Sequence, residues 1–147
     1  MGRNKMKKLL SVLIVVVVFS GITHAQELGL RFGDIVGNNV AIDGVFAFSG
    51  QRIHADVSFG DGVGVEALAD FIIKPLSGEA FFYYIGAGAF AWLGDPFQLG
   101  ISGELGLEYR FNTVPLALGL DWRPSFRIID DTDFHADRFG FNIRYVF

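Results

Sequence analysis

Hydrophobic and polar residues alternate along most of the chain after position 26. Between positions 97 and 111 the odd positions carry Phe, Leu, Ile or Tyr, with one glycine at 103, and the even positions carry charged residues, Gln, Ser or Gly. The segments 52–60 and 138–147 repeat this alternation. A period of two is typical of β-strands, because successive side chains of a strand point to opposite faces of the sheet.

The alternation predicts eight strands, joined by connectors rich in Gly, Asp, Asn and Pro. The predicted strands cover residues 27–33, 40–48, 52–60, 63–73, 81–93, 97–111, 114–126 and 138–147. Only the connector 127–137 is long, and 74–80 is a comparatively long turn. Eight amphipathic strands with no helix between them predict an all-β fold, a closed antiparallel up-and-down barrel.

The N-terminal segment has a different pattern. Residues 9–19 are almost continuously apolar, and four basic residues precede them. A helix over that run would rise about 16 Å, roughly half of a ~30 Å hydrocarbon core. A basic segment, a short apolar run and the ending Thr23-His24-Ala25 are typical of a secretory signal peptide. We expect residues 1–25, or 6–25 if Met6 is the start, to be cleaved off and residues 26–147 to form the barrel domain.

Every charge in the seven predicted strands from 40–48 to 138–147 falls on their polar face, and Arg31 joins this face from the first strand. The candidate lumen residues are Arg31, Asp43, Arg52, His54, Asp56, Glu66, Asp70, Glu104, Glu108, Arg110, Asp121, Arg123, Arg138 and Arg144. The bases are all arginine, whose planar group suits enclosed carboxylates, whereas a strand face in water favours lysine. Glycines on the same face leave room for long side chains inside a narrow barrel. We therefore expect this face to line the lumen.

Alternation alone fits two kinds of barrel. A soluble secreted lipocalin-like carrier is apolar inside, and a membrane barrel is apolar outside. After the first, the predicted strands have about nine or more residues, close to the ~9–11 that cross a tilted bilayer path. Aromatic residues such as Tyr83, Trp122 and Tyr145 lie near strand ends, as in interfacial girdles. These features favour a closed eight-stranded transmembrane β-barrel.

Composition narrows the function. The chain has no cysteine, which excludes disulfides, thiol catalysis and a lipidated N-terminal cysteine. Without residues 1–25 all 16 acids and 8 of the 12 bases remain, so the net charge changes from −4 to −8. Nucleic acid is therefore not an expected partner, because phosphate binding needs a basic face. No sequence motif indicates a cofactor, and we expect none.

The last nine residues carry the most specific motif. Its alternating apolar positions are Phe139, Phe141, Ile143, Tyr145 and Phe147. This segment resembles the C-terminal assembly signal of outer-membrane barrels, and residues 26–147 are similar in pattern to the small OmpA-, OmpX- and OmpW-like barrels. The resemblance implies an integral outer-membrane monomer after Sec-type export, surrounded by lipid and lipopolysaccharide. It also implies the barrel-assembly machinery and periplasmic chaperones as partners during biogenesis.

The lumen is the main candidate site. An eight-stranded barrel is just wide enough for side chains to fill it. Seven acids and six arginines on the polar face therefore predict an ion-paired plug and a structural, non-enzymatic envelope role. A narrow, porin-like path for water or ions is the alternative. Two of the expected external connectors, 61–62 and 94–96, are very short for this family, which disfavours adhesion through loops.

A lipid A-modifying barrel enzyme is a second alternative, and it needs a His with a Ser and an acid near the outer rim. The candidate sets are His135 with Ser125 and Asp131 or Asp133, and His54 with Asp56 and Ser58. The PagL-like pattern places Ser two residues after His, where this chain has Asp137. His54 would lie too deep in the barrel to reach a lipid ester. We therefore expect no enzymatic activity.

The connector 127–137 also concentrates possible metal ligands. They are Asp130, Asp131, Asp133, His135 and Asp137. Hard cations such as Ca²⁺ bind several carboxylate oxygens, and a cation bridge to lipopolysaccharide phosphates is conceivable here. The spacing lacks the central glycine and the final Glu of an EF-hand loop. We expect these acids to be solvated and to hold no metal.

Overall fold

The computed structural model of the chain describes residues 2–22, 26–36, 38–78, 80–94, 96–129 and 131–147. Within these ranges it contains one helix and ten strands. They are α1 (Arg3–Ile22), β1 (Glu27–Ile35), β2 (Asn38–Phe48), β3 (Gln51–Phe59), β4 (Val63–Ser77), β5 (Phe81–Leu93), β6 (Gln98–Arg110), β7 (Leu116–Trp122), β8 (Ser125–Ile129), β9 (Asp133–His135) and β10 (Phe139–Val146).

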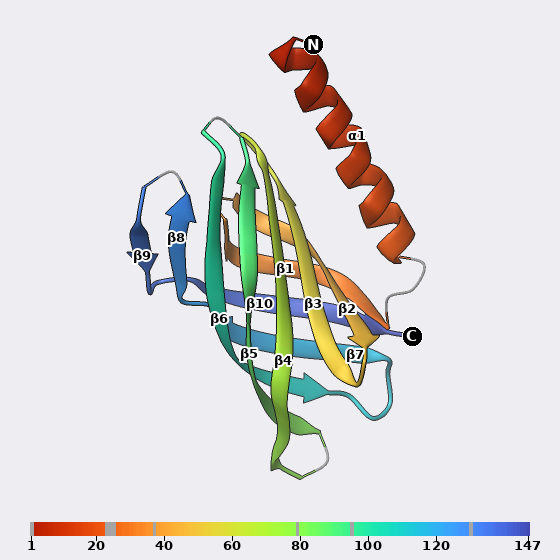
Figure 1. Cartoon of the computed structure of the whole chain (residues 1–147). Helices are drawn as coiled ribbons and strands as arrows, with labels where there is room; N and C mark the ends of the chain where they lie inside the picture. The colour runs from red at the N-terminus through yellow and green to blue at the C-terminus, as the bar shows by residue number, and fades with distance from the viewer. Residues whose placement is uncertain (1, 23–25, 37, 79, 95, 130) are drawn as a thin grey trace.

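The strands β1 to β7 and β10 form a closed barrel (Figure 1). Their order is β5-β4-β3-β2-β1-β10-β7-β6, and every pairing is antiparallel. The pairing of β5 with β6 closes the ring. The predicted all-β, closed, antiparallel barrel of eight strands is therefore confirmed.

The prediction was wrong over residues 123–137, where a single connector was expected after residue 126. Past Pro124 the chain continues along β6 as β8, with Ser125 opposite Ser102, and then folds back as β9. Proline has no N–H to donate, so the ladder is interrupted at this point. The Pro124 carbonyl still accepts a hydrogen bond of 2.8 Å from the Gly103 N–H. The β8–β9 hairpin therefore extends the barrel wall at its mouth.

The predicted connector 74–80 is also corrected. β4 runs to Ser77, and Lys74, Pro75 and Ser77 pair with residues at the start of β5. Pro75 is tolerated because register shifts flank the segment and relax the ladder there. The 34–39 connector is likewise shorter than expected, since β1 ends at Ile35 and β2 begins at Asn38; Gly37 lies outside the described residues.

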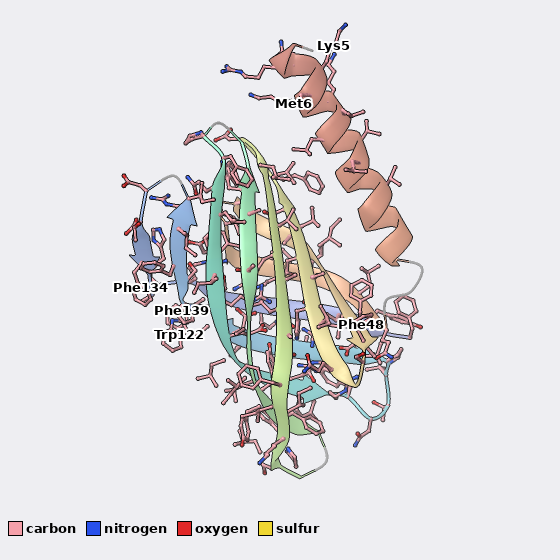
Figure 2. All side chains as sticks on the ribbon, in the orientation of Figure 1. Lys5, Met6, Phe48, Trp122, Phe134 and Phe139 are labelled. Carbon is pink, nitrogen blue, oxygen red and sulfur yellow. The ribbon has the colours of Figure 1, made fainter. Side chains whose placement is uncertain are left out.

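The two faces of the barrel wall differ sharply in chemistry. In β6, Glu104 is 3% exposed, whereas the adjacent Leu105 is 46% exposed. The same alternation holds in β10, where Asn142 and Arg144 are buried and Phe141 and Ile143 are exposed. Figure 2 shows many carbon-only side chains projecting outward from the barrel. The charged face therefore points inward and the apolar face points outward.

Helix α1 lies beside the barrel rather than inside it (Figure 1). Its described side chains, among them Met6, Leu9 and Leu13, are exposed. Within the described residues, the structure contains no helix with enough length and apolar character to span a bilayer. The predicted cleavage sequence Thr23-His24-Ala25 lies outside the described residues.

Candidate functional site

The candidate site is the charged interior of the barrel. The structure places all fourteen predicted lumen residues on the inner face, where Arg52 and Arg110 are half-buried and the other twelve are buried. They come from seven of the eight barrel strands or their immediate continuations, and β5 contributes none of them. Their side chains form three groups joined by ion pairs. Between these groups lies a fourth set in which several polar atoms lack a hydrogen-bond partner.

The first group, here the Arg144 cluster, joins residues near the start of β1 and the end of β10. The Arg144 guanidinium lies 3.1 Å from Glu27 Oε1 and 3.3 Å from Asp43 Oδ2, and it also contacts Glu108. Glu108 Oε2 in turn lies 3.1 Å from Arg52 Nη1 and 3.0 Å from Arg110 Nη1. Both oxygens of Glu108 are therefore engaged by arginine.

The second group, the Arg123 cluster, lies nearer the β8–β9 hairpin. Arg123 contacts Asp56, and its Nη1 lies 2.9 Å from Glu66 Oε1 while its Nη2 lies 3.1 Å from Glu104 Oε1. Glu66 also accepts hydrogen bonds of 3.0 Å from Arg138 Nη1 and 2.6 Å from the Ser102 hydroxyl. The Glu66 carboxylate thus joins Arg123 and Arg138, which precede and follow Pro124 in the chain.

The third contact joins two strands that are not neighbours. Arg31 of β1 donates to Asp121 of β7, with 2.9 Å from Nε to Oδ2 and 2.5 Å from Nη2 to Oδ1. Both side chains are fully buried. Gly140 of the intervening β10 makes this possible, since a Cβ there would overlap the Arg31 guanidinium. This is the role expected of lumen glycines.

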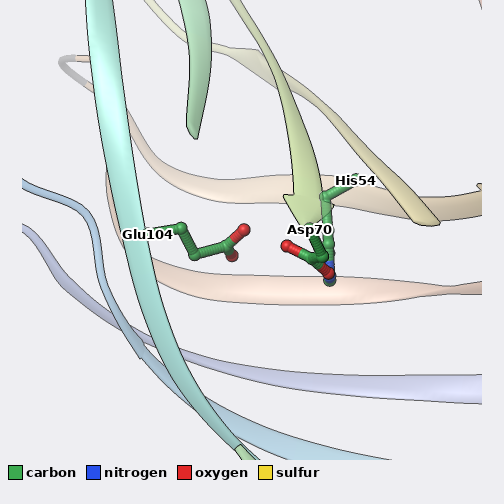
Figure 3. A group of neighbouring side chains, drawn as sticks. All are labelled: His54, Asp70 and Glu104. Carbon is green, nitrogen blue, oxygen red and sulfur yellow. The ribbon is translucent and has the colours of Figure 1, made fainter. Parts of the chain in front are cut away.

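Between the clusters lies a set made of His54, Asp70 and Glu104 (Figure 3). His54 Nε2 is 2.8 Å from Asp70 Oδ2, an oxygen that also accepts a 2.7 Å hydrogen bond from Arg52 Nε. The His54 ring stacks on Tyr84 with 5.4 Å between ring centroids, and the Arg52 guanidinium lies 4.7 Å from the centre of the same Tyr84 ring. Three strands therefore bring an imidazole and two carboxylates together.

The predicted site left out several buried residues of the described interior. Among them are Glu27, Tyr84, Ser102 and Asn142, of which Ser102 and Asn142 were placed on the polar face but not in the charge network. Each shares its parity with predicted lumen positions of the same strand: Tyr84, for example, is two residues from Gly86. The alternation therefore held the signal, but only charged residues and histidine were collected from it.

The barrel mouth has a pocket of about 370 Å³ beside the β8–β9 hairpin. Ser125 and His135 both line it and are direct cross-strand partners, Ser125 being buried and His135 exposed. His135 Nε2 lies 3.3 Å from Asp133 Oδ2. The structure thus brings three of the enzyme candidates to one place, whereas His54 contacts Asp70 and not the candidate partner Asp56.

The acidic residues of 130–137 are dispersed. Asp130 lies outside the described residues, and Asp131, Asp133, His135 and Asp137 are exposed. In the part of the chain that the structure describes, the one group of three possible metal ligands is His54, Asp70 and Glu104, not this segment. The Asp133 carboxylate lies near Arg127 instead, at 3.8 Å.

The inner face can hold charges, exchange protons within the lumen or bind a cation. Buried ion pairs of this kind stabilise a fold only when each charge keeps its partner.

Comparisons of the chain with family models, with curated proteins and with solved structures give no match.

Proposed function

We propose that this protein is an integral outer-membrane β-barrel with an ion-paired lumen and a structural, non-enzymatic role in the envelope. The observation that carries the proposal is the distribution of polarity across the wall. Large apolar residues on the outside, such as Ile101 at 54% and Leu120 at 58% exposure, alternate with buried charges. In this arrangement lipid, rather than water, is the favourable surrounding of the outer face.

A soluble protein rarely exposes a contiguous apolar patch larger than a few hundred Å². Here exposed apolar side chains occur on every barrel strand: β10 alone contributes Phe139, Phe141 and Ile143. A lipocalin-like carrier would need the opposite arrangement, with an apolar interior, where this barrel has arginine and carboxylate. Closure of the sheet through β5 and β6 also leaves no unpaired barrel edge, which lipid requires.

The lumen network supports a plug rather than a wide channel. Arg31, Arg123 and Arg144 are fully buried, and each contacts a carboxylate on a strand that is not a neighbour of its own: Asp121, Glu66 and Asp43, respectively. Water or ions would have to pass between these charged groups. A narrow path is therefore the sharper alternative, and planar-bilayer conductance of the purified protein tests it. We also propose that residues 1–25 direct export and are removed, so that Gln26 becomes the first residue.

Cysteine labelling tests the proposal residue by residue, because the chain has no cysteine of its own. Single variants Leu107→Cys and Ile143→Cys, each carrying an environment-sensitive fluorophore, are reconstituted in vesicles with bromine-labelled acyl chains. Both labels should be quenched by the bromine. Gln51→Cys, at an exposed strand end, is the control and should be quenched much less. Equal quenching at all three positions would argue against a lipid-facing apolar surface.

A second candidate is hydrolysis at the barrel mouth, which the facing pair of Ser125 and His135 favours. The arrangement is incomplete, because Asp133 lies on Nε2 of the His135 ring, the side opposite to the Nδ1 that an orienting acid uses in a serine triad. Measurement of lipid A acylation in cells that express the protein distinguishes hydrolysis from a purely structural role. A change that disappears with His135→Ala would favour the enzyme.

A further inference from the structure

Some carboxylates of the lumen lack partners for their second oxygen. Both oxygens of Asp121, Glu66 and Glu108 accept hydrogen bonds. In contrast, four buried carboxylate oxygens of the described residues have no hydrogen-bond partner: Asp43 Oδ1, Asp56 Oδ1, Asp70 Oδ1 and Glu104 Oε2. A buried carboxylate oxygen without a partner is costly, so such atoms point to a missing partner.

Two of these carboxylates, Asp70 and Glu104, lie close to the His54 ring. His54 of β3, Asp70 of β4 and Glu104 of β6 each present a possible ligand atom, and these three atoms lie within 4.8 Å of one another. Both ring nitrogens of His54 also lack a hydrogen bond with proper geometry, and the ring is fully buried. Figure 3 shows the two carboxylates pointing toward each other across the lumen. Two carboxylates in this position repel each other unless a positive charge lies between them.

The described interior contains fewer positive than negative charges. Eight acidic side chains are buried there: Glu27, Asp43, Asp56, Glu66, Asp70, Glu104, Glu108 and Asp121. Six arginines face them: Arg31, Arg52, Arg110, Arg123, Arg138 and Arg144. With His54 neutral, two negative charges remain in excess among the described residues, which equals the charge of one divalent cation.

We propose that His54, Asp70 and Glu104 form a binding site for one divalent cation of the zinc type inside the barrel. One imidazole nitrogen and two carboxylate oxygens suit Zn²⁺ better than Ca²⁺ or Mg²⁺, which prefer oxygen ligands alone. Bonds of about 2.0–2.1 Å place tetrahedral ligands roughly 3.4 Å apart, so the ligand atoms, which lie within 4.8 Å of one another, have to approach by up to about 1.4 Å. Water would complete the coordination. The inference is independent of whether the barrel lies in a membrane.

The Arg52 and Arg123 guanidiniums act as the outer support of this site. Arg52 Nε binds Asp70 Oδ2 at 2.7 Å, and Arg123 Nε donates a 3.2 Å hydrogen bond to Glu104 Oε1. Each arginine therefore holds one oxygen of a carboxylate and leaves the other oxygen without a hydrogen-bond partner. Partners that orient metal-binding side chains in this way typically change metal affinity 10- to 100-fold when removed.

Calorimetric titration of the purified full chain with ZnCl₂, after dialysis against a chelator, tests the site. We expect one Zn²⁺ per chain, and at least a tenfold weaker affinity for Glu104→Gln, which preserves the size of the side chain. The matched control is Glu108→Gln, a buried lumen carboxylate whose two oxygens are both engaged by arginine; it should bind Zn²⁺ as the unmodified chain does. Ca²⁺ should bind much more weakly than Zn²⁺.

A second measurement uses the unmodified chain, so the test does not depend on whether Glu104→Gln folds. The unmodified chain is heated with Zn²⁺ and with chelator, and Zn²⁺ should raise the temperature of unfolding, because a ligand that binds only the folded state stabilises it. Absence of Zn²⁺ uptake by the unmodified chain would overturn the proposal. A protonated His54 paired with Asp70 would then supply the positive charge between the carboxylates. Equal affinity of Glu104→Gln and Glu108→Gln for Zn²⁺ would also overturn it.

Discussion

Arg31 on β1 and Asp121 on β7 form a buried, doubly hydrogen-bonded ion pair across the intervening strand β10, with 2.5 Å between Arg31 Nη2 and Asp121 Oδ1. The pair therefore joins strands that share no backbone hydrogen bonds. Such contacts through the lumen fix the circumference of the barrel in a way that the strand ladder alone does not.

Removal of one member of this pair should destabilise the barrel strongly. Asp121→Asn leaves a buried guanidinium uncompensated, a change that costs about 3–5 kcal/mol in comparable sites. The free energy of unfolding in urea measures the effect. Asp133→Asn, in an exposed ion pair, is the control and should change it by less than about 1 kcal/mol. Equal effects of the two variants would contradict a structural role for the lumen pair.

The outward face is tested by a charge at Leu105, which is 46% exposed at the middle of β6. If this residue faces lipid, Leu105→Arg should lower the free energy of unfolding in bilayers by about 2–4 kcal/mol. Gln51→Arg, at an exposed strand end, serves as the reference and should be nearly neutral. A Leu105→Arg protein as stable as the Gln51→Arg protein would reverse the assignment of the faces.

The inner face is tested by a methyl group at Gly106. A Cβ at this position would overlap the Tyr84 ring, whereas a Cβ at Gly103, which faces outward, would meet its nearest atom, in Pro124, at 3.7 Å. We expect Gly106→Ala to cost about 1–3 kcal/mol through overpacking and Gly103→Ala to cost little. Thermal unfolding of both variants measures these two costs in stability. If Gly103→Ala is the more damaging of the two, Tyr84 does not occupy the lumen as described.

Deletion of Phe147 separates assembly from stability. The Phe147 N–H donates a 2.9 Å hydrogen bond to the Gln26 carbonyl, and loss of one such bond costs only about 1 kcal/mol. If the last nine residues are an assembly signal, the variant should refold in detergent almost normally but reach the outer membrane at a much lower level. Quantitative immunoblotting of membrane fractions measures this. A normal level would remove the support for the signal.

The alternation in the sequence predicted the barrel well because each wall position has only two possible directions. Glu104 and Leu105 are assigned correctly by parity alone. Parity says nothing about which strand lies opposite across the lumen. The convergence of His54, Asp70 and Glu104 depends on the registers of several strand pairs, which no local pattern contains.

The region after Pro124 was mispredicted for a different reason. Asp130 to Asp137 is rich in acids and interrupts the apolar alternation, so it was expected to be a connector. The β8–β9 hairpin forms there because the chain continues in register along β6, with Phe126 opposite Ile101 and Phe134 opposite Phe126. Such an extension is determined by the length of the partner strand, and the composition of the segment does not show it.

The central claim, a barrel inserted in the outer membrane with its apolar face toward lipid, is tested most directly by heat-modifiability. Outer-membrane fractions of cells that express the full chain are run on a detergent gel with and without boiling. The account predicts that the protein is found in this fraction and that the unboiled protein migrates as a compact form which shifts on boiling, since the ion-paired, closed barrel resists the detergent until heated. A soluble periplasmic protein with no shift would contradict the claim.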